Sequence, residues 1–171
     1  VLFVPTPGAA NDNSNPTPVA NLKLNEVYSR GVETDPDWVE VFNAGTESVD
    51  MSGWKIYDAG GQSGSKPKKE FPAGSVVAPG EWIVIVVDDA DASGFGLSSN
   101  GEKIWLENSS STLVDSVEFP ALDENTSFGR YPDGTDNWQV LNVVTKGAAN
   151  NNSTPPPAII VKMNEIFSKG V

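Results

Sequence analysis

Short runs of Val, Ile, Trp, Tyr and Phe recur about every 10 to 15 residues along the chain, with turn-forming dipeptides between them. No stretch carries the sustained apolar period of an amphipathic helix. The pattern therefore predicts an all-β fold. We expect strands at residues 22–28, 38–43, 53–57, 69–71, 82–87, 103–107, 113–119, 127–131 and 138–141.

One of these runs, residues 83–87, is apolar at every position. Strands that are covered on both faces have such sequences, whereas strands with one solvated face alternate between apolar and polar residues. We therefore expect residues 83–87 to form a central strand.

The first expected strand contains a carboxylate among apolar side chains. Alternation places Leu22, Leu24, Glu26 and Tyr28 on one face of this strand. Burying an unpaired carboxylate costs several kcal/mol, so Glu26 needs partners. Three roles remain open for it: a structural Glu that accepts hydrogen bonds from backbone N–H groups or from Arg30, a calcium ligand, or the acid of a Lys–Asn isopeptide crosslink.

The chain repeats its beginning near its end. Residues 1–32 align without a gap with residues 140–171, at an offset of 139, and more than half of the aligned positions are identical. We interpret the chain as one repeat period plus an overlap, within a longer tandem array. The residues expected to carry the assembly are those of the first strand and its second copy: Leu22, Leu24, Glu26, Tyr28, Ile160, Met163, Glu165 and Phe167.

Two stretches rich in Pro and Asn divide the chain. Pro favours extended polyproline conformations, so we expect residues 11–18 and 150–157 to be extended linkers. Residues 1–10 are then the tail of a preceding repeat, residues 19–149 are one complete β-sandwich, and residues 158–171 are the first strand of the next repeat.

Charge and composition narrow the range of functions. The chain has 23 acidic residues against 11 Lys and Arg, a net charge of −12, which disfavours nucleic acid as a partner. It contains no His and no Cys, which removes Cys–His nucleophilic pairs and ordinary zinc sites. No apolar run approaches the roughly 18 residues of a membrane span. We therefore expect a protein that is not an enzyme and has no membrane span in this segment.

The sharpest local motif is an acidic one. The sequence Asp-Ala-Asp-Ala-Ser-Gly has the spacing of a calcium loop, with Asp89, Asp91 and Ser93 as oxygen ligands at alternate positions and a glycine at the sixth. Asp88 adds a further carboxylate. The twelfth position is Asn100 and not the usual bidentate Glu, so a solvated acidic turn is the alternative. Calcium is the one candidate cofactor.

Five tryptophans suggest a surface for stacking sugars. Each tryptophan lies within or beside an expected strand, where such a residue more often belongs to the core or covers a sheet. Carbohydrate binding is therefore an alternative and not the main interpretation.

In the segment 25–58, an Asn-Glu strand is followed by the strand WVEVFN at residues 38–43 and by the turn MSGW at residues 51–54. This order of motifs resembles the opening of lamin tail domains. The resemblance extends over about residues 22–150 and implies an immunoglobulin-like β-sandwich. Without a heptad rod, the chain looks like the prokaryotic form, an accessory module of secreted and surface proteins that sometimes lies beside nucleases or other hydrolases. Further similarities lie at residues 71–82, 97–105, 113–117, 138 and 147–150.

Together these features predict an immunoglobulin-like β-sandwich with extended Pro-rich linkers. We expect a non-catalytic structural repeat of an extracellular filament, sheath or surface stalk, whose partners are copies of itself or adjacent repeats. The alternatives are a calcium- or polysaccharide-binding adhesion module and an accessory domain of a secreted hydrolase. Either way, the expected location is extracellular or at the cell surface.

Overall fold

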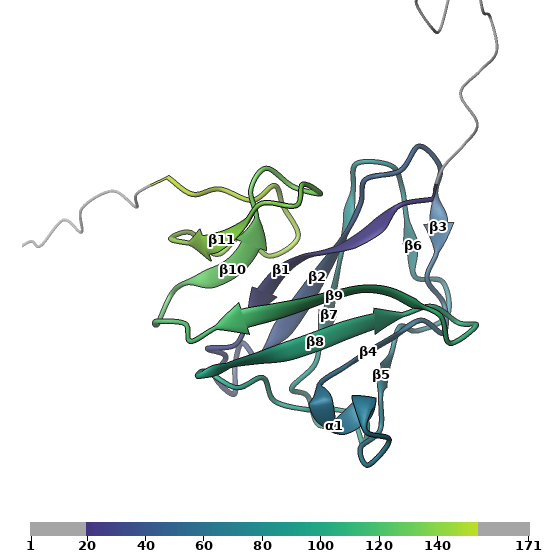
Figure 1. Ribbon diagram of the computed structural model, residues 1–171, viewed down its shortest axis with the longest axis horizontal. Coiled ribbons are helices and arrows are strands. Elements are labelled where there is room, and N and C mark those ends of the chain that lie inside the picture. The colour runs from purple at the N-terminus through teal and green to yellow at the C-terminus, as the bar shows by residue number, and fades with distance from the viewer. Residues whose placement is uncertain (1–19, 154–171) are drawn as a thin grey trace, which may run out of the picture.

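The computed structural model describes residues 20–153, which form a β-sandwich (Figure 1). Among the described residues no helix is long and apolar enough to cross a membrane. The predicted all-β sandwich is confirmed. Its elements are β1 (Leu22–Tyr28), β2 (Trp38–Asn43), β3 (Val49–Asp50), β4 (Lys55–Tyr57), α1 (Ala59–Gln62), β5 (Lys69–Glu70), β6 (Val76–Val77), β7 (Trp82–Val86), β8 (Gly101–Glu107), β9 (Leu113–Pro120), β10 (Ser127–Arg130) and β11 (Trp138–Leu141).

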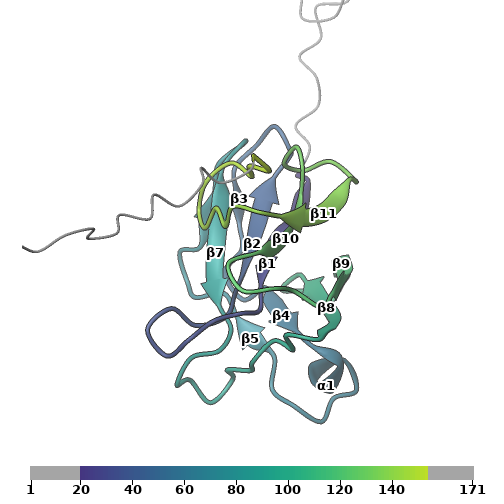
Figure 2. The same cartoon turned by 90° about the vertical axis from the view of Figure 1, so that its left-hand side faces the viewer.

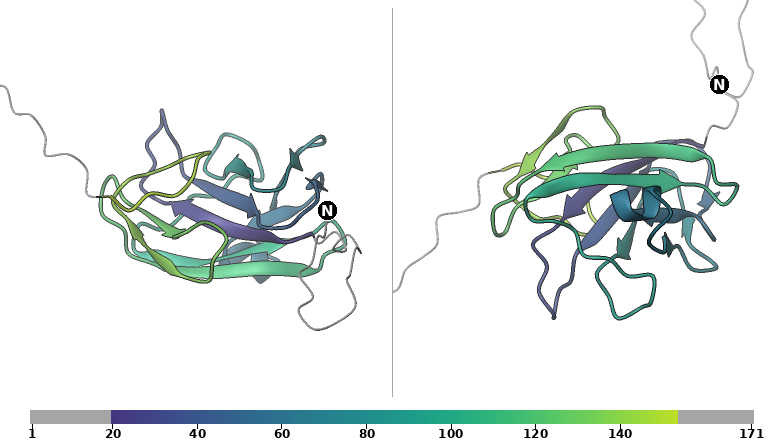
Figure 3. Two further views of the ribbon diagram at one scale, coloured as in Figure 1. Left: turned by 90° about the horizontal axis from the view of Figure 1, so that it is seen from above. Right: turned by 60° about the horizontal axis from the view of Figure 1, so that its bottom comes forward.

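Two antiparallel sheets form the layers of the sandwich. The first has five strands in the order β11-β10-β1-β2-β7, and the second has four in the order β5-β4-β8-β9. A two-stranded ribbon of β3 and β6 completes the fold. Figure 3 shows the two layers from above and from below. In this order β1 lies at the centre of the five-stranded sheet, between β10 and β2.

The core lies between the two main sheets. Apolar side chains alternate inward along the strands, and each one that is fully buried contributes roughly 1.5 to 3 kcal/mol relative to exposure. The best buried of these include Leu24, Val27, Val39, Val41, Met51, Ile56, Ile104 and Leu106.

A β-bulge at Asn25 changes the faces of β1. The pairing of β1 with β2 shifts between Leu24 and Glu26, so that Val27 continues the core face of Leu24. The expectation that Glu26 shares a face with Leu22 and Leu24 is therefore wrong, because the extra residue turns Glu26 to the outer face of the sheet.

Strand β7 is last in the sheet that residues 20–153 form, so within this part of the chain the expectation of a central strand is wrong. Figure 2 shows it at the margin of the sheet. Both of its faces are nevertheless covered: Ile83 and Ile85 pack on the core, and on the other side Gly147 approaches Val84, whose Cγ2 would lie 3.9 Å from a Cβ at position 147. The unbroken apolar run thus reflects the covering of both faces and not a central position.

After β11 the chain crosses the outer face of the five-stranded sheet as a strap, residues 142–153. Lys146 Nζ lies 5.6 Å from the centre of the Trp38 ring, and Val143 forms a bridge with Asn151. Asn150 is only 7% exposed. Asn150, the first residue of the expected linker at residues 150–157, therefore belongs to the folded domain, because its side chain is tied into the sheet by hydrogen bonds. Residues 154–157 lie outside the described residues.

The tryptophans cover the sheets, as expected. Four of the five lie against an aromatic neighbour, three of them stacked and Trp82 tilted by 40°, and such pairs are favourable at the surface of a sheet. The pairs are Trp38 with Tyr28, Trp82 with Phe42, Trp105 with Tyr57 and Trp138 with Phe128, at centroid distances of 5.7, 5.6, 6.0 and 5.3 Å.

Candidate functional site

A lysine occupies the centre of the expected calcium loop. Lys69 Nζ lies 2.6 Å from Asp89 Oδ2 and 3.3 Å from Asp91 Oδ2, and the lysine is buried. The backbone N–H of Ser93 and the Lys69 ammonium both lower the pKa of Asp91. An ammonium thus provides the positive charge that a calcium ion would bring.

Calcium binding by Asp88, Asp89, Asp91 and Ser93 stays a prediction. Within residues 20–153 no group of three or more acidic side chains is arranged to hold a metal ion. Ser93 contributes its backbone N–H, which donates to Asp91 Oδ1 at 3.2 Å. A calcium ion at this loop would have to displace Lys69.

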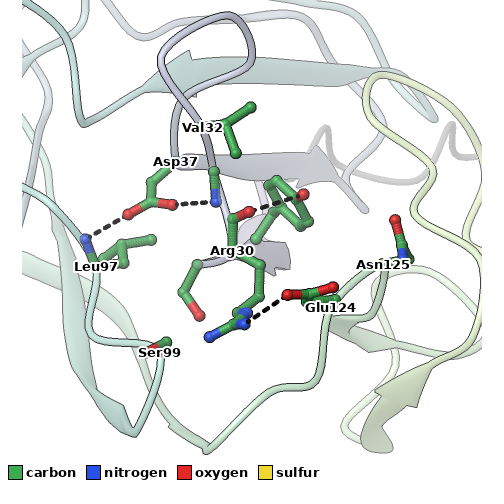
Figure 4. Close-up of a pocket in the computed structure, with 10 residues that line it drawn as sticks. Arg30, Val32, Asp37, Leu97, Ser99, Glu124 and Asn125 are labelled. Carbon is green, nitrogen blue, oxygen red and sulfur yellow. Dashed lines mark hydrogen bonds and ion pairs between the residues drawn. The ribbon is translucent and has the colours of Figure 1, made fainter.

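A cavity of about 630 Å³ opens beyond the end of β1 (Figure 4). Asp37 accepts hydrogen bonds from the N–H groups of Gly31 and Leu97, both at 2.8 Å, and burial raises the pKa of its carboxyl group. Arg30 forms a long ion pair of 3.6 Å with Glu124. Most of the charged groups that line the cavity are therefore paired with each other or with backbone, and the lining assigns no ligand.

Gly31 is required at the mouth of this cavity. A Cβ at this position would lie 2.3 Å from the backbone N of Asp37 and 2.5 Å from the backbone C of Pro36. No flexible side chain can relieve these contacts, so only glycine allows the β1–β2 loop to close on itself.

Glu26 is fully buried on the outer face, under the strap. Its carboxylate accepts hydrogen bonds from the Ser127 hydroxyl, from Thr145 N at 3.1 Å and from Thr145 Oγ1 at 2.8 Å. Burial raises the pKa of Glu26 against the effect of these three donors. The backbone N–H partner expected for a structural Glu is thus present, whereas Arg30 pairs elsewhere. Among the described residues its hydrogen-bond partners include no lysine, so the isopeptide hypothesis gains no support.

Glu40 lies opposite Glu26 in the β1–β2 pairing and is also fully buried. It accepts hydrogen bonds from Asn25 Nδ2 at 3.0 Å and from Gly147 N at 2.7 Å. Burial raises the pKa of Glu40 to about 8, with a contribution from the charges of Glu26 and Asp133. Glu40 therefore holds a proton at neutral pH.

Two asparagines connect these carboxylates to the strap. Asn25 donates to Asp133 Oδ1 at 2.8 Å and accepts from Gly134 N at 3.0 Å. Asn150 donates from its side chain to Arg130 O at 2.8 Å and to Asn25 O at 3.2 Å. We call the group of Asn25, Glu26, Glu40, Asp133 and Asn150 the outer-face network. It fixes the strap onto the centre of the sheet.

Arg130 joins this sheet to the other one. It is 5% exposed and donates from Nε to Leu24 O at 2.7 Å and from Nη2 to Asp115 Oδ2 at 3.0 Å. Asp115 belongs to β9 and also accepts from Leu24 N at 3.0 Å, next to the bulge at Asn25. Sequence reasoning missed this residue. The sequence signal for its role is an arginine at the end of an expected strand, with acidic residues shortly before and after it in the chain.

The expected assembly residues of the first copy all serve their own domain. Leu22 and Leu24 belong to the core, Glu26 to the outer-face network, and Tyr28 stacks on Trp38. The second-copy residues Ile160, Met163, Glu165 and Phe167 lie outside the described residues.

Comparison with known protein families supports the resemblance seen in the sequence. The family model of the Lamin Tail Domain matches residues 15–121, which is more than half of the chain. The match includes β1 to β9 and ends before β10, so the strap and Arg130 lie beyond it. No curated protein matches the chain. Lamin tail domains are non-catalytic immunoglobulin-like sandwiches, which agrees with the fold described above. The chain belongs to the lamin tail domain family.

Proposed function

We propose that this chain is a non-catalytic structural repeat of an extracellular filament, sheath or surface stalk. Neighbouring repeats or copies are joined through the second copy of the β1 sequence, at residues 158–171. The family is often a structural or interaction module, which is consistent with this role. The extracellular location rests on the resemblance to the prokaryotic members of the family.

The observation that carries the proposal is that β1 already occupies the centre of the five-stranded sheet. Strand β1 is hydrogen-bonded to β2 on one side and to β10 on the other, and its Asn25-Glu26 pair is fully buried. The second copy repeats this pair as Asn164-Glu165. The centre of the described sheet is therefore already occupied, and we expect a second strand of this pattern to pair at the sheet edge of a neighbouring domain.

The alternatives have less support. The acidic loop expected to bind calcium is engaged by Lys69, and the tryptophans that would stack on sugars mostly stack on aromatic neighbours.

A chain that ends at residue 157 tests the proposal. We expect it to fold like the full chain, because residues 20–153 contain the whole sandwich, and to remain monomeric in sedimentation velocity and in negative-stain electron microscopy. The full chain should form fibres or higher oligomers under the same conditions.

The matched control keeps all 171 residues but reorders residues 158–171, so that composition and charge are unchanged and the alternation is lost. This control should also fail to assemble. Assembly of the shortened chain at the concentration of the full chain would refute the proposed function.

A further inference from the structure

The outer edge of β7 is a row of backbone groups without a partner strand in the described part of the chain. At one end of β7, Asn43 N donates to Glu81 O at 3.0 Å, and at the other Val87 N donates to Asp37 O at 2.9 Å. Bonded and non-bonded pairs alternate along an antiparallel ladder. Both ends therefore give the same assignment: the odd-numbered residues of β7 bond to β2.

The even-numbered residues of β7 consequently point the other way. The N–H and C=O groups of Trp82, Val84 and Val86 face away from β2, and β7 is last in the order of the described sheet. Natural proteins usually protect such an edge with charged residues, proline or a bulge. The segment Trp82–Val86 contains only Trp, Ile and Val, and no irregularity interrupts its pairing with β2.

A groove of about 320 Å³ lies beside this edge. One wall is Val84, Ile85 and Val86 of β7, and the other is β5, the edge strand of the second sheet. Its polar lining includes Glu70, Asp89 and Asp91, together with the buried Lys69 that binds the last two. The sandwich is thus open on this side, with an apolar strand edge and an acidic rim.

We propose that the β7 edge binds residues 159–167 of another copy of this chain, which add a sixth strand to the five-stranded sheet. This inference rests on the proposed function, and it names the surface that receives the terminal strand. Addition of a strand to a sheet edge supplies main-chain hydrogen bonds, while alternate side chains give specificity.

The sequence of the second copy suits this edge. It begins with three consecutive β-branched residues, Ile159, Ile160 and Val161, which favour strands. Residues 158–171 carry a net charge of +1, from two lysines and one glutamate, in a chain whose net charge is −12. Two such chains repel each other, and a positively charged segment is the part best suited to approach the acidic rim.

A short stretch of chain joins the described domain to this segment. Residues 154–158 span at most about 18 Å when fully extended, so the receiving copy must lie directly beside the domain. The nine residues 159–167 would form a strand about 30 Å long. This strand is longer than the five-residue strand β7 and can pair with its whole length.

The test is the substitution Val84→Pro in the full chain. Proline removes only the N–H that points away from β2, and edge strands tolerate it there. The matched control is Val84→Ala, which removes both methyl groups of Val84 but keeps the N–H. We expect Val84→Pro to stay folded by circular dichroism and to need at least a tenfold higher concentration to assemble than Val84→Ala. Equal assembly of the two variants would overturn the inference.

The outcomes separate this inference from the proposed function. If removal of residues 158–171 abolishes assembly but Val84→Pro does not, the strand binds elsewhere and only the inference fails. If Val84→Pro abolishes assembly but the removal does not, β7 pairs with something other than this segment, and both fail. Should Val84→Pro not fold, amide exchange in the unmodified chain decides: the amides of Val84 and Val86 must gain protection on assembly, and unchanged exchange overturns the inference.

Discussion

Replacing Arg130 with Met is expected to lower the free energy of unfolding by about 3 to 5 kcal/mol, the cost of breaking a buried ion pair from one side. Arg130 is 5% exposed, and its guanidinium donates hydrogen bonds to Leu24 O and Asp115 Oδ2 and lies 4.6 Å from the centre of the Trp138 ring. Methionine fills much of the volume but leaves the Asp115 carboxylate without its cation, between the two sheets.

The measurement is urea denaturation of the full chain at neutral pH, with Lys23→Met as the matched control. Lys23 forms an ion pair of 3.0 Å with Asp136, whose side chain is 91% exposed. Exposed pairs of this kind contribute about 0 to 1 kcal/mol. If Arg130→Met lowers the free energy of unfolding no more than Lys23→Met does, Arg130 does not hold the two sheets together.

A second large effect is expected from pH. The pKa of Glu40 is 4.5 in its ordinary state and about 8 in the fold, so the folded state binds this proton more tightly than the unfolded state does. Its contribution to stability is therefore complete below about pH 4.5 and is lost as the pH rises through 8. The loss is on the order of 3 to 5 kcal/mol, at 1.36 kcal/mol per pKa unit.

The substitution Glu40→Gln isolates this contribution. An amide is neutral at every pH, so the stability of the variant relative to the wild-type chain should rise between pH 5 and pH 9. An amide nitrogen cannot accept a hydrogen bond, so one of the two donors, Asn25 Nδ2 or Gly147 N, loses its acceptor at every pH. The measurement is chemical denaturation of both chains at pH 5, 7 and 9. If the difference in the free energy of unfolding between the two chains is the same at all three pH values, Glu40 is not the group that binds the proton.

Much of the fold follows from the sequence because alternation and turn residues are local signals. The bounds of β1, β2 and β11 agree with the expected strands to the residue. Strands β3 and β6, with two residues each, and the four-residue α1 are too short to show a period, so they were not predicted. The edge position of β7 depends on which strands pair, and periodicity carries no information on pairing.

The site contacts could not be predicted, because they join distant parts of the chain. Lys69 lies 20 residues before Asp89, and Thr145 lies 119 residues after Glu26. The bulge at Asn25 could not be predicted, because a seven-residue strand is too short to show that its alternation changes phase after Leu24. The strap has the composition of a linker, since asparagines favour loops, yet the same side chains can satisfy buried carboxylates and carbonyls.

Hydrogen exchange of the β7 amides reports the addition of a strand at this edge without any substitution. In the monomer, the inward N–H groups of Ile83 and Ile85 should be protected, whereas those of Trp82, Val84 and Val86 should exchange faster. On assembly of the full chain, we expect exchange at these three amides to slow by at least a hundredfold, which makes protection uniform along the strand. Retention of the alternating pattern in the assembled state would contradict the addition of a strand at this edge.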